Sequence, residues 1–449
     1  MSQGKEIQLS DHFSFGRWLR FTAPTITMMV FLSIYGVVDG LMVSNFVGKT
    51  PFAALNIIWP YVAILSAFGF MFSTGGSALV AKLLGEQKKA KAQSVFTMLL
   101  IAAAATGFIL GIFGLLTMRK MAILMGAEGE LVELCCIYAR ILMLTLPVYL
   151  LQIFFQAFMV TAERPKLGLW ITVAAGITNM VLDVVFIGVF RWGLVGAALA
   201  TALGEAVGAF GPLIYFLTQE HNTNAPLRLV KPSIDLSSLW QTASNGLSEL
   251  VMNLSLSLVS MLYTRQLLTK VGENGVIAYG EIMYFAFAFM AVFIGFGMGS
   301  APAISYHFGA GNKQELHSLV TKSIVIVTSC GILISLLAQI MASPLSKILV
   351  GYDDELFNYA TRAFRIYALC YLFCGLNCAA SAFFTALNNG PVSALISLLR
   401  TIVLEAGCVI VIPMLFGIEA IWCSVTVAEV ITTIVSIFLF FKLKPKYGY

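Results

Sequence analysis

The feature that most constrains this chain is a succession of about twelve apolar runs separated by short polar breaks. Each run is long enough to cross a bilayer as a helix, which takes about 20 residues. Only 11% of the residues are charged and 59% are hydrophobic, whereas soluble domains are about 25% charged. The chain is therefore expected to be an all-α polytopic membrane protein. The expected spans are approximately 15–40, 52–77, 94–117, 132–159, 167–190, 194–218, 240–268, 276–300, 318–342, 360–385, 393–416 and 419–441.

The second half of the sequence repeats the first. When Val47-Gly48 is placed on Val271-Gly272, the same shift aligns the break 83–92 (LLGEQKKAKA) with 307–316 (HFGAGNKQEL) and Glu205 with Glu429. This predicts an amino-terminal lobe (1–218), a cytoplasmic linker (219–235) and a carboxyl-terminal lobe (236–449). With six spans each, the two bundles keep the same membrane orientation. Parallel repeats of this kind place a central cavity between the bundles, which is typical of transporters.

The distribution of basic residues predicts the orientation. If the amino terminus lies inside, most Lys and Arg residues fall in inside segments such as 83–92, whereas the acidic run 353–355 falls outside. Cytoplasmic loops carry the excess of Lys and Arg. Both termini are therefore expected to be cytoplasmic, in a multi-pass protein of the cytoplasmic (inner) membrane.

Two acidic residues lie inside apolar runs. Asp183 interrupts the run GITNMVLDVVFI four residues after Asn179, so the two share one helix face, and Asp39 lies in the first span. Thr201 and Glu205 repeat the i, i+4 spacing on the sixth span. Carboxylates at this depth are costly and usually functional. Together with amide and hydroxyl oxygens they could hold a proton or Na⁺; alternatively, they only bond neighbouring helices together.

At these residues the chain resembles the multidrug and toxic compound extrusion (MATE) family of secondary antiporters, over essentially its whole length. FTAPTIT (with Pro24), VDGLMVSNFVG, ALVAKLLGEQKKAKA and the two parallel halves carry the resemblance. The NxxxD motif, with Thr201 on the next span, is similar to the amino-terminal-lobe cation site of prokaryotic members. The resemblance implies that Asp39, Asn179, Asp183 and Thr201 bind H⁺ or, alternatively, Na⁺. It also implies that Pro24 is a bend point of the first span; the alternative is that Pro24 only starts or ends a helix.

The resemblance further implies export of drugs and lipophilic or cationic organic compounds in exchange for H⁺ (or Na⁺), by alternating access and with no cofactor. A monomer in the lipid membrane is expected. One branch of the family also has a carboxylate pair in the carboxyl-terminal lobe. Here the span-seven position falls near Ser257, and 360–385 contains no Asp or Glu. The carboxyl-terminal lobe instead offers Glu281, and Arg400 with Glu405 as possible structural partners.

The substrate surface is expected to combine aromatic, Met and amide side chains, which suit flat lipophilic cations. Each of these side chains could equally face lipid or pack between helices. The candidates are Met28, Met29, Tyr35, Gln152, Phe155, Gln156, Asn253, Glu281, Met283 and Tyr284.

Other classes fit the sequence less well. The four histidines lie in polar breaks or the amino-terminal tail, and no HExxH, GxSxG or GxxxxGK[ST] motif occurs, so neither an enzyme nor a metal centre is expected. The stripe Cys370, Cys374 and Cys378 has no histidine nearby and is interpreted as helix packing. No basic stripe with interleaved aromatics indicates nucleic acid. A lipid-linked precursor flippase of the same superfamily is the main alternative; a sugar-porter-like transporter is disfavoured because GEQKKAKA stands where its basic GxxxDRxGRR-like run would lie.

Overall fold

The computed structural model describes residues 7–219, 221–351 and 353–449, and this part of the chain is helical without any β-strand. Twelve helical segments are long and apolar enough to cross a membrane, as the sequence predicts. The amino-terminal lobe comprises α1 (Phe15–Met42), η1 (Val43–Val47), α2 (Lys49–Phe70), η2 (Met71–Gly75), α3 (Gly76–Gly85), α4 (Lys89–Leu124), α5 (Glu130–Thr161), α6 (Pro165–Asp183), η3 (Val184–Val189) and α7 (Gly193–Thr218).

The carboxyl-terminal lobe repeats this order after the connection. It comprises α8 (Leu236–Lys270), α9 (Glu273–Gly309), α10 (Lys313–Val350), α11 (Asp354–Tyr367), η4 (Ala368–Cys370), α12 (Tyr371–Ala386), α13 (Gly390–Leu398), η5 (Leu399–Glu405), α14 (Ala406–Phe416), η6 (Ile418–Cys423) and α15 (Ser424–Tyr447). Glycines with positive φ lie at helix boundaries at equivalent places in both lobes, Gly48 with Gly272 and Gly193 with Gly417. Only glycine adopts this conformation without strain, which explains why these repeat positions share a residue.

The sequence predicts uninterrupted spans, but the structure differs here. Four π-helical segments, η1, η2, η3 and η5, lie within or at the end of spans one, two, five and eleven. A π turn keeps its backbone hydrogen bonds inside the helix, as i to i+5 pairs, so it satisfies the requirement that the lipid interior places on the backbone. Hydropathy therefore does not reveal it. Such turns often mark functional positions.

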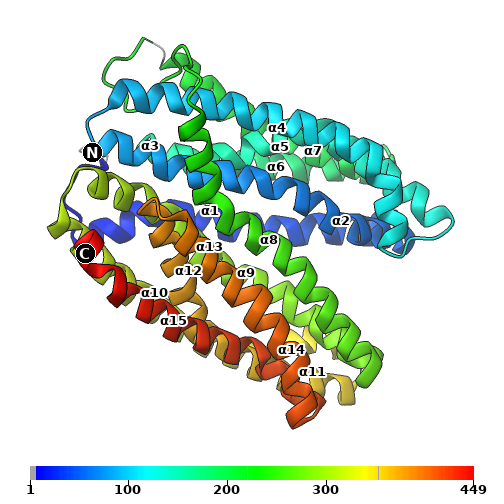
Figure 1. Cartoon of the computed structure of the whole chain (residues 1–449). Helices are drawn as coiled ribbons and strands as arrows, with labels where there is room; N and C mark the ends of the chain where they lie inside the picture. Colours follow the sequence, from blue (N-terminus) through cyan, green and yellow to red (C-terminus); the bar gives the residue numbers. More distant parts are fainter. Residues whose placement is uncertain (1–6, 220, 352) are drawn as a thin grey trace, which may run out of the picture.

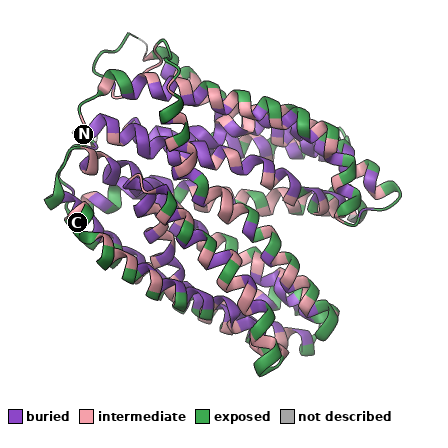
Figure 2. Ribbon diagram, in the orientation of Figure 1, coloured by how far each residue is buried: buried purple, intermediate pink, exposed green. Residues whose placement is uncertain are grey.

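Exposed residues lie mainly on the outer faces of the helices and buried residues mainly between them (Figure 2), and many of the exposed residues are large and apolar. Leu116, Ile340 and Phe441, for example, are more than two-thirds exposed. Exposure of large apolar side chains on this scale is not sustainable in water. These faces are the surface that lipid covers in a multi-pass membrane protein.

The two lobes meet at the end of the molecule that carries both termini and diverge toward the other end (Figure 1). Helix α9 packs against α1 and α3, and α8 packs against η2. Glycines allow these close approaches. A Cβ on Gly85 would lie 2.0 Å from the carbonyl oxygen of Tyr306, and one on Gly309 would lie 2.2 Å from that of Lys82. The sequence repeat aligns Gly85 with Gly309 and Lys82 with Tyr306, so it relates the two contacts to each other.

Two segments, the one before α1 and the one before α8, also connect the lobes. In the first, Leu9 donates its backbone N–H to Glu163 Oε1 (2.7 Å) of the amino-terminal lobe. His12 Nδ1 lies 2.6 Å from Glu315 Oε2, and Phe13 N donates to Glu315 Oε1 at 2.9 Å, both at the start of α10 in the carboxyl-terminal lobe. Residues 7–13 therefore bridge the lobes at their closed end.

The connection before α8 makes the reciprocal crossing to α4 of the amino-terminal lobe. Ser233 N donates to Ser94 Oγ at 2.9 Å, and Lys91 Nζ lies 3.3 Å from Asp235 Oδ2. Hydrogen bonds from the Ser238 backbone N–H and hydroxyl lower the pKa of the Asp235 carboxyl, which caps α8, and Lys91 acts in the same direction. Both leading segments thus fix the same end of the two lobes together.

The glycine contacts predict the outcome of a substitution at the closed end. Gly85→Ala places a methyl group against the backbone of Tyr306, so the lobes must separate locally, at a cost of about 1–3 kcal/mol for overpacking. The melting temperature of the purified protein should fall. Gly280→Ala on α9 is the matched control, because a Cβ there meets nothing within 4 Å. Equal melting temperatures for the two variants would contradict the tight approach of the lobes.

Candidate functional site

Two aspartates end regular helices in the interior of the amino-terminal lobe. Asp39 lies near the end of α1, where its carbonyl accepts the backbone N–H of Val43 at the entry to η1. Asp183 is the last residue of α6 and immediately precedes η3. Both carboxylates therefore stand next to π-helical turns, on helices that pack against each other.

The Asp39 and Asp183 carboxyls lie within hydrogen-bonding reach of each other. Asp183 is fully buried, and neither of its oxygens has a protein donor among the described residues. Two carboxylates in contact repel strongly unless a proton or a metal cation lies between them. The two carboxyls therefore form a candidate site for a proton or a metal cation.

The neighbouring helix α7 is brought close by a glycine. A Cβ on Gly204 would lie 2.9 Å from the Asn179 Cβ, so α7 packs directly on the face of α6 that carries Asn179. Asn179 is 2% exposed, and both polar atoms of its amide lack a hydrogen-bond partner among the described residues. Thr201 donates its hydroxyl to the Ala197 carbonyl (3.1 Å), which leaves the oxygen lone pairs available. The predicted set of Asp39, Asn179, Asp183 and Thr201 is thus assembled from α1, α6 and α7.

Four polar groups near these residues extend the site. Glu205, which the sequence marks only by its spacing from Thr201, is 6% exposed, and its Oε2 has no partner among the described residues. The hydroxyls of Tyr35, Tyr138 and Tyr149 lie within electrostatic range of Glu205, and those of Tyr35 and Tyr138 also within range of both aspartates. Sequence reasoning missed Tyr138 and Tyr149. The only sign of them in the sequence is a tyrosine hydroxyl within an apolar span. Because this chain contains many aromatic residues, that sign does not single out Tyr138 or Tyr149.

The arrangement suits a hard cation or a proton rather than a transition metal. Within residues 7–219, 221–351 and 353–449 there is no group of three His, Cys, Asp or Glu side chains able to hold a metal ion. Carboxylate, amide and hydroxyl oxygens are instead the donors that hard cations accept. The unpartnered oxygens of Asn179 and Asp183 are the groups that such an ion, or a proton shared with Asp39, would satisfy.

Pro24 lies ten residues into α1, which begins at Phe15 and continues to Met42. The alternative that it only starts or ends a helix is therefore excluded. Next to it, Thr25 and Ile26 contact the other lobe, where a Cβ on Gly295 of α9 would lie 2.6 Å from the Ile26 Cα. The missing hydrogen bond at Pro24 thus lies within the stretch of α1 that contacts α9 of the other lobe.

Part of the predicted substrate surface is assembled at the same level. Met28 is buried against Ala157 of α5 and Met298 of α9, with Met29 beside it, so it spans the two lobes. Gln152 and Gln156 are buried on α5, and their Oε1 atoms lack donors among the described residues. Buried amide oxygens without partners are costly, so they are candidates for contact with a substrate or water.

Other predicted substrate residues are not brought to this place. Glu281 is hydrogen-bonded to Ser346 of α10, inside the carboxyl-terminal lobe, and lies about 25 Å along α9 from Met298 at 1.5 Å per residue. Tyr284, one turn further on, is half exposed, and Met283 packs on the core of that lobe.

Two further expectations are corrected. Phe155 is 1% exposed and stacks on Phe216 in the amino-terminal core, so it does not offer a surface to a ligand. Arg400 forms its ion pair with Glu429 of α15 and not with Glu405 of its own segment. Asn253, the remaining candidate, is half-buried and donates to the Glu249 carbonyl of its own helix (2.8 Å).

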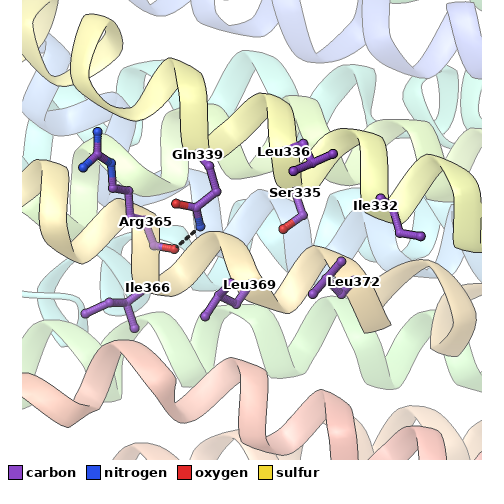
Figure 3. Close-up of a pocket in the computed structure, with 8 residues that line it drawn as sticks. All are labelled: Ile332, Ser335, Leu336, Gln339, Arg365, Ile366, Leu369 and Leu372. Carbon is purple, nitrogen blue, oxygen red and sulfur yellow. Dashed lines mark hydrogen bonds between the residues drawn. The ribbon is translucent and has the colours of Figure 1, made fainter.

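A surface groove of about 460 Å³ lies between α10 and the α11–α12 segment. Ile332, Leu336 and Leu372 line it, and Gln339 Nε2 donates to the Arg365 carbonyl at one end (Figure 3). Its lining contains none of the predicted site residues. It is an apolar groove on the outside of the carboxyl-terminal lobe, distinct from the site between α1, α6 and α7.

Comparisons with known proteins agree with the repeat and the fold. The family model described as MatE matches residues 24–185 and again residues 249–410, so each lobe carries one match. The Multidrug export protein MepA of Staphylococcus aureus (strain bovine RF122 / ET3-1) is 21% identical over 435 residues, covering 96% of this chain and 94% of that protein. The MepA protein of Staphylococcus saprophyticus is 22% identical over 431 residues, covering 95% and 94%.

Solved structures are similar over the whole chain. A transporter of the MOP superfamily from Pyrococcus furiosus, described as having a binding pocket of reverse polarity, superposes with a TM-score of 0.91 at 20% identity, covering 100% of both chains. A multidrug resistance MATE family transporter in an outward-facing conformation gives a TM-score of 0.89 at 21% identity, covering 98% of both. At this level of identity the likeness establishes the two-lobe fold.

The position of Pro24 predicts the effect of removing it. Pro24→Ala restores one backbone hydrogen bond within α1, so the helix should bend less readily, while the melting temperature should stay the same or rise. Transport in vesicles should slow. Pro60→Ala on α2 is a suitable control, since it also removes a proline from inside a spanning helix. Unchanged transport by Pro24→Ala would rule out a hinge at this residue.

Proposed function

Because the chain belongs to the MatE family of multidrug efflux transporters, we propose that it is a secondary active antiporter that exports drugs and organic cations in exchange for H⁺, with Na⁺ as the alternative coupling ion. The observation that carries this proposal is the contact between the Asp39 and Asp183 carboxyls in the interior of a membrane-spanning lobe. Without a bound proton or cation, the two carboxylates repel each other and destabilise the packing of α1 on α6. Ion binding is thereby linked to the positions of these two helices.

The mechanism follows from what each group does. A proton or Na⁺ at Asp39 and Asp183 removes the repulsion between α1 and α6, and Asn179 and Thr201 supply further oxygen ligands. The hydroxyls of Tyr35, Tyr138 and Tyr149 can accept or donate hydrogen bonds as the carboxyls change charge. Loss of the ion restores the repulsion, so occupancy of the site biases the conformation of α1.

The movement of α1 connects this site to the substrate. Pro24 is the weak point of the helix, and Met28 lies one turn beyond it, between the lobes. Bending at Pro24 changes the surface that Met28, Gln152 and Gln156 offer to a lipophilic cation. Substrate and coupling ion then compete through one conformational equilibrium, and alternating access follows when the lobes separate at their closed end and approach at the other.

The opposite assignment, a flippase for lipid-linked precursors, would need a strongly cationic cavity. The buried Arg400 is already ion-paired with Glu429, 2.6 Å away, so it does not supply free positive charge. The orientation that we propose places both termini in the cytoplasm, in the cytoplasmic (inner) membrane, with the protein acting as a monomer. The linker between the lobes then lies on the cytoplasmic side.

The direct test replaces Asp183. Asp183→Asn fills the same volume and is much cheaper to bury than a carboxylate, so expression should remain nearly normal while gradient-driven efflux of a dye is lost. Asp353→Asn, at the exposed start of α11, is the matched control and should transport normally. Efflux by Asp183→Asn at the wild-type rate would show that the aspartate pair does not couple transport.

The identity of the ion is tested by imposing a pH gradient and a Na⁺ gradient separately across vesicles that contain the purified protein. If H⁺ is the coupling ion, linkage is reciprocal. External acidification should weaken substrate binding to the outward-open state, and substrate binding at fixed pH should release protons to an indicator dye. Affinity that is independent of pH but falls as Na⁺ is added would assign the coupling to Na⁺.

A further inference from the structure

The two lobes have kept one buried carboxylate in common and changed everything around it. The repeat aligns Glu205 of α7 with Glu429 of α15, and both are almost fully buried. The same shift aligns Asp39 with Tyr263 and Asp183 with Gly407, so the aspartate pair has no counterpart in the carboxyl-terminal lobe. Glu429 is therefore the one of these three acidic positions that the carboxyl-terminal lobe retains.

Glu429 differs from Glu205 in its hydrogen bonds. Whereas Glu205 Oε2 has no partner in the part of the chain that the structure describes, both oxygens of Glu429 accept hydrogen bonds. Oε1 lies 2.6 Å from Arg400 Nε and Nη2 and 3.2 Å from Cys374 Sγ. Oε2 accepts from Asn377 Nδ2 at 2.6 Å. The acceptor sites that a coupling ion would use are thus occupied by protein donors.

The surrounding groups hold this arrangement in place. Asn377 is oriented by Thr433 and Ser436, whose hydroxyls donate to its Oδ1 at 3.3 and 3.2 Å. Arg400 Nη1 lies 3.1 Å from Cys378 Sγ, which explains part of the cysteine stripe that the sequence singled out. The Arg400 side chain is 10% exposed.

Arg400 is an addition of the carboxyl-terminal lobe. Its counterpart in span five falls within Ala174-Ala175-Gly176, where no side chain could reach across to α7. Two half-buried carboxylates, Glu249 of α8 and Glu405 of η5, also lie within electrostatic range of Arg400. A guanidinium remains charged at every accessible pH, and it is covalently held at the site, so a free ion competes with it poorly.

We propose that Arg400 is a built-in cation: its guanidinium permanently fills the carboxyl-lobe counterpart of the amino-lobe cation site, so that the coupling ion is exchanged in the amino-terminal lobe alone. This inference rests on the proposed function of Asp39 and Asp183. It adds that the carboxyl-terminal lobe keeps the same charge and binds no coupling ion during the transport cycle. It also accounts for the absence of an aspartate pair in that lobe.

Removal of Arg400 should turn the filled site into a vacant one. We would make Arg400→Ala in an Asp39→Asn/Asp183→Asn background, which removes the ion response of the other lobe. The melting temperature would be measured in NaCl and in choline chloride, over a range of pH, and with methylguanidinium added. Arg400→Ala should be less stable than its parent and should regain stability with Na⁺, acid or methylguanidinium. Adding Glu429→Gln should abolish that response.

Arg362→Ala is the matched control, because it removes one positive charge from the same lobe at an exposed ion pair with Glu419. It should show no response to cations. A folded Arg400→Ala variant that behaves like Arg362→Ala would overturn the proposal.

A second variant covers the case in which Arg400→Ala does not fold. Arg400→Gln/Glu429→Gln, in an otherwise wild-type chain, removes both charges and leaves no unpaired one. The ratio of ions to substrate transported should be unchanged, and an altered ratio would show that Glu429 exchanges ions and overturn the proposal. Failure of the proposed function itself looks different: Asp183→Asn would then transport normally, whatever the carboxyl-lobe variants do.

Discussion

The structure depends on the requirement that backbone polar groups inside lipid find their hydrogen-bond partners within the protein. It makes the chain helical throughout the spans. It permits a departure from the α-helix only where another pattern of backbone hydrogen bonds replaces the regular i to i+4 pattern. The π turns after Asp39 and Asp183 meet that condition. They alter the course of the helix at the two positions where carboxylates must converge, without exposing a peptide group to lipid. The same requirement makes each buried polar side chain expensive, so each one needs a partner or a function.

The two lobes answer this demand in opposite ways. In the amino-terminal lobe, Asp39 and Asp183 lie close together, and atoms of both carboxyls and of Glu205 lack a hydrogen-bond partner in the described part of the chain. In the carboxyl-terminal lobe, Arg400 neutralises Glu429, and Asn377 completes the hydrogen bonds. In the function that we propose, one scaffold, repeated once, holds a site for an external cation in one lobe and an arginine at the corresponding place in the other. A buried ion pair adds little net stability, so its value here lies in fixing the charge of one lobe.

Contacts between the lobes are concentrated at one end and are built largely from backbone. Gly85 and Gly309 let α3 and α9 bring their backbones into direct contact, and the leading segments before α1 and α8 cross reciprocally. Such contacts have few rotatable side chains, so they close or open as a unit rather than by gradual deformation. Pro24 lies on α1, which carries both the contacts to α9 of the other lobe and Asp39.

Much of this protein could be predicted from its sequence alone. The spans followed from hydropathy, the two lobes from the internal repeat, and the placement of Asn179 and Asp183 on one helix from their spacing in an apolar run, because each of these is a local or periodic property of the chain. An apolar segment inside lipid has few alternatives to the helix, because its backbone groups must form hydrogen bonds within the segment. For Pro24 the sequence left two alternatives, a position inside the helix or at its start or end, and the structure shows the first.

Tertiary structure decided which polar groups meet. The sequence offers Glu405, on the same span, as a possible partner of Arg400, but Arg400 bonds to Glu429 on another helix. Glu281, a candidate for the predicted substrate surface, bonds instead to Ser346. Tyr138 and Tyr149 of α5 lie near the buried acidic side chains of the amino-terminal lobe, and no motif marks them. Hydropathy and spacing determine how far a residue lies along its own helix and which face it occupies. The partner across a helix interface depends on how two helices are rotated and how closely they approach, as where Gly204 lets α7 pack on Asn179 of α6, and no linear pattern of residues encodes that geometry.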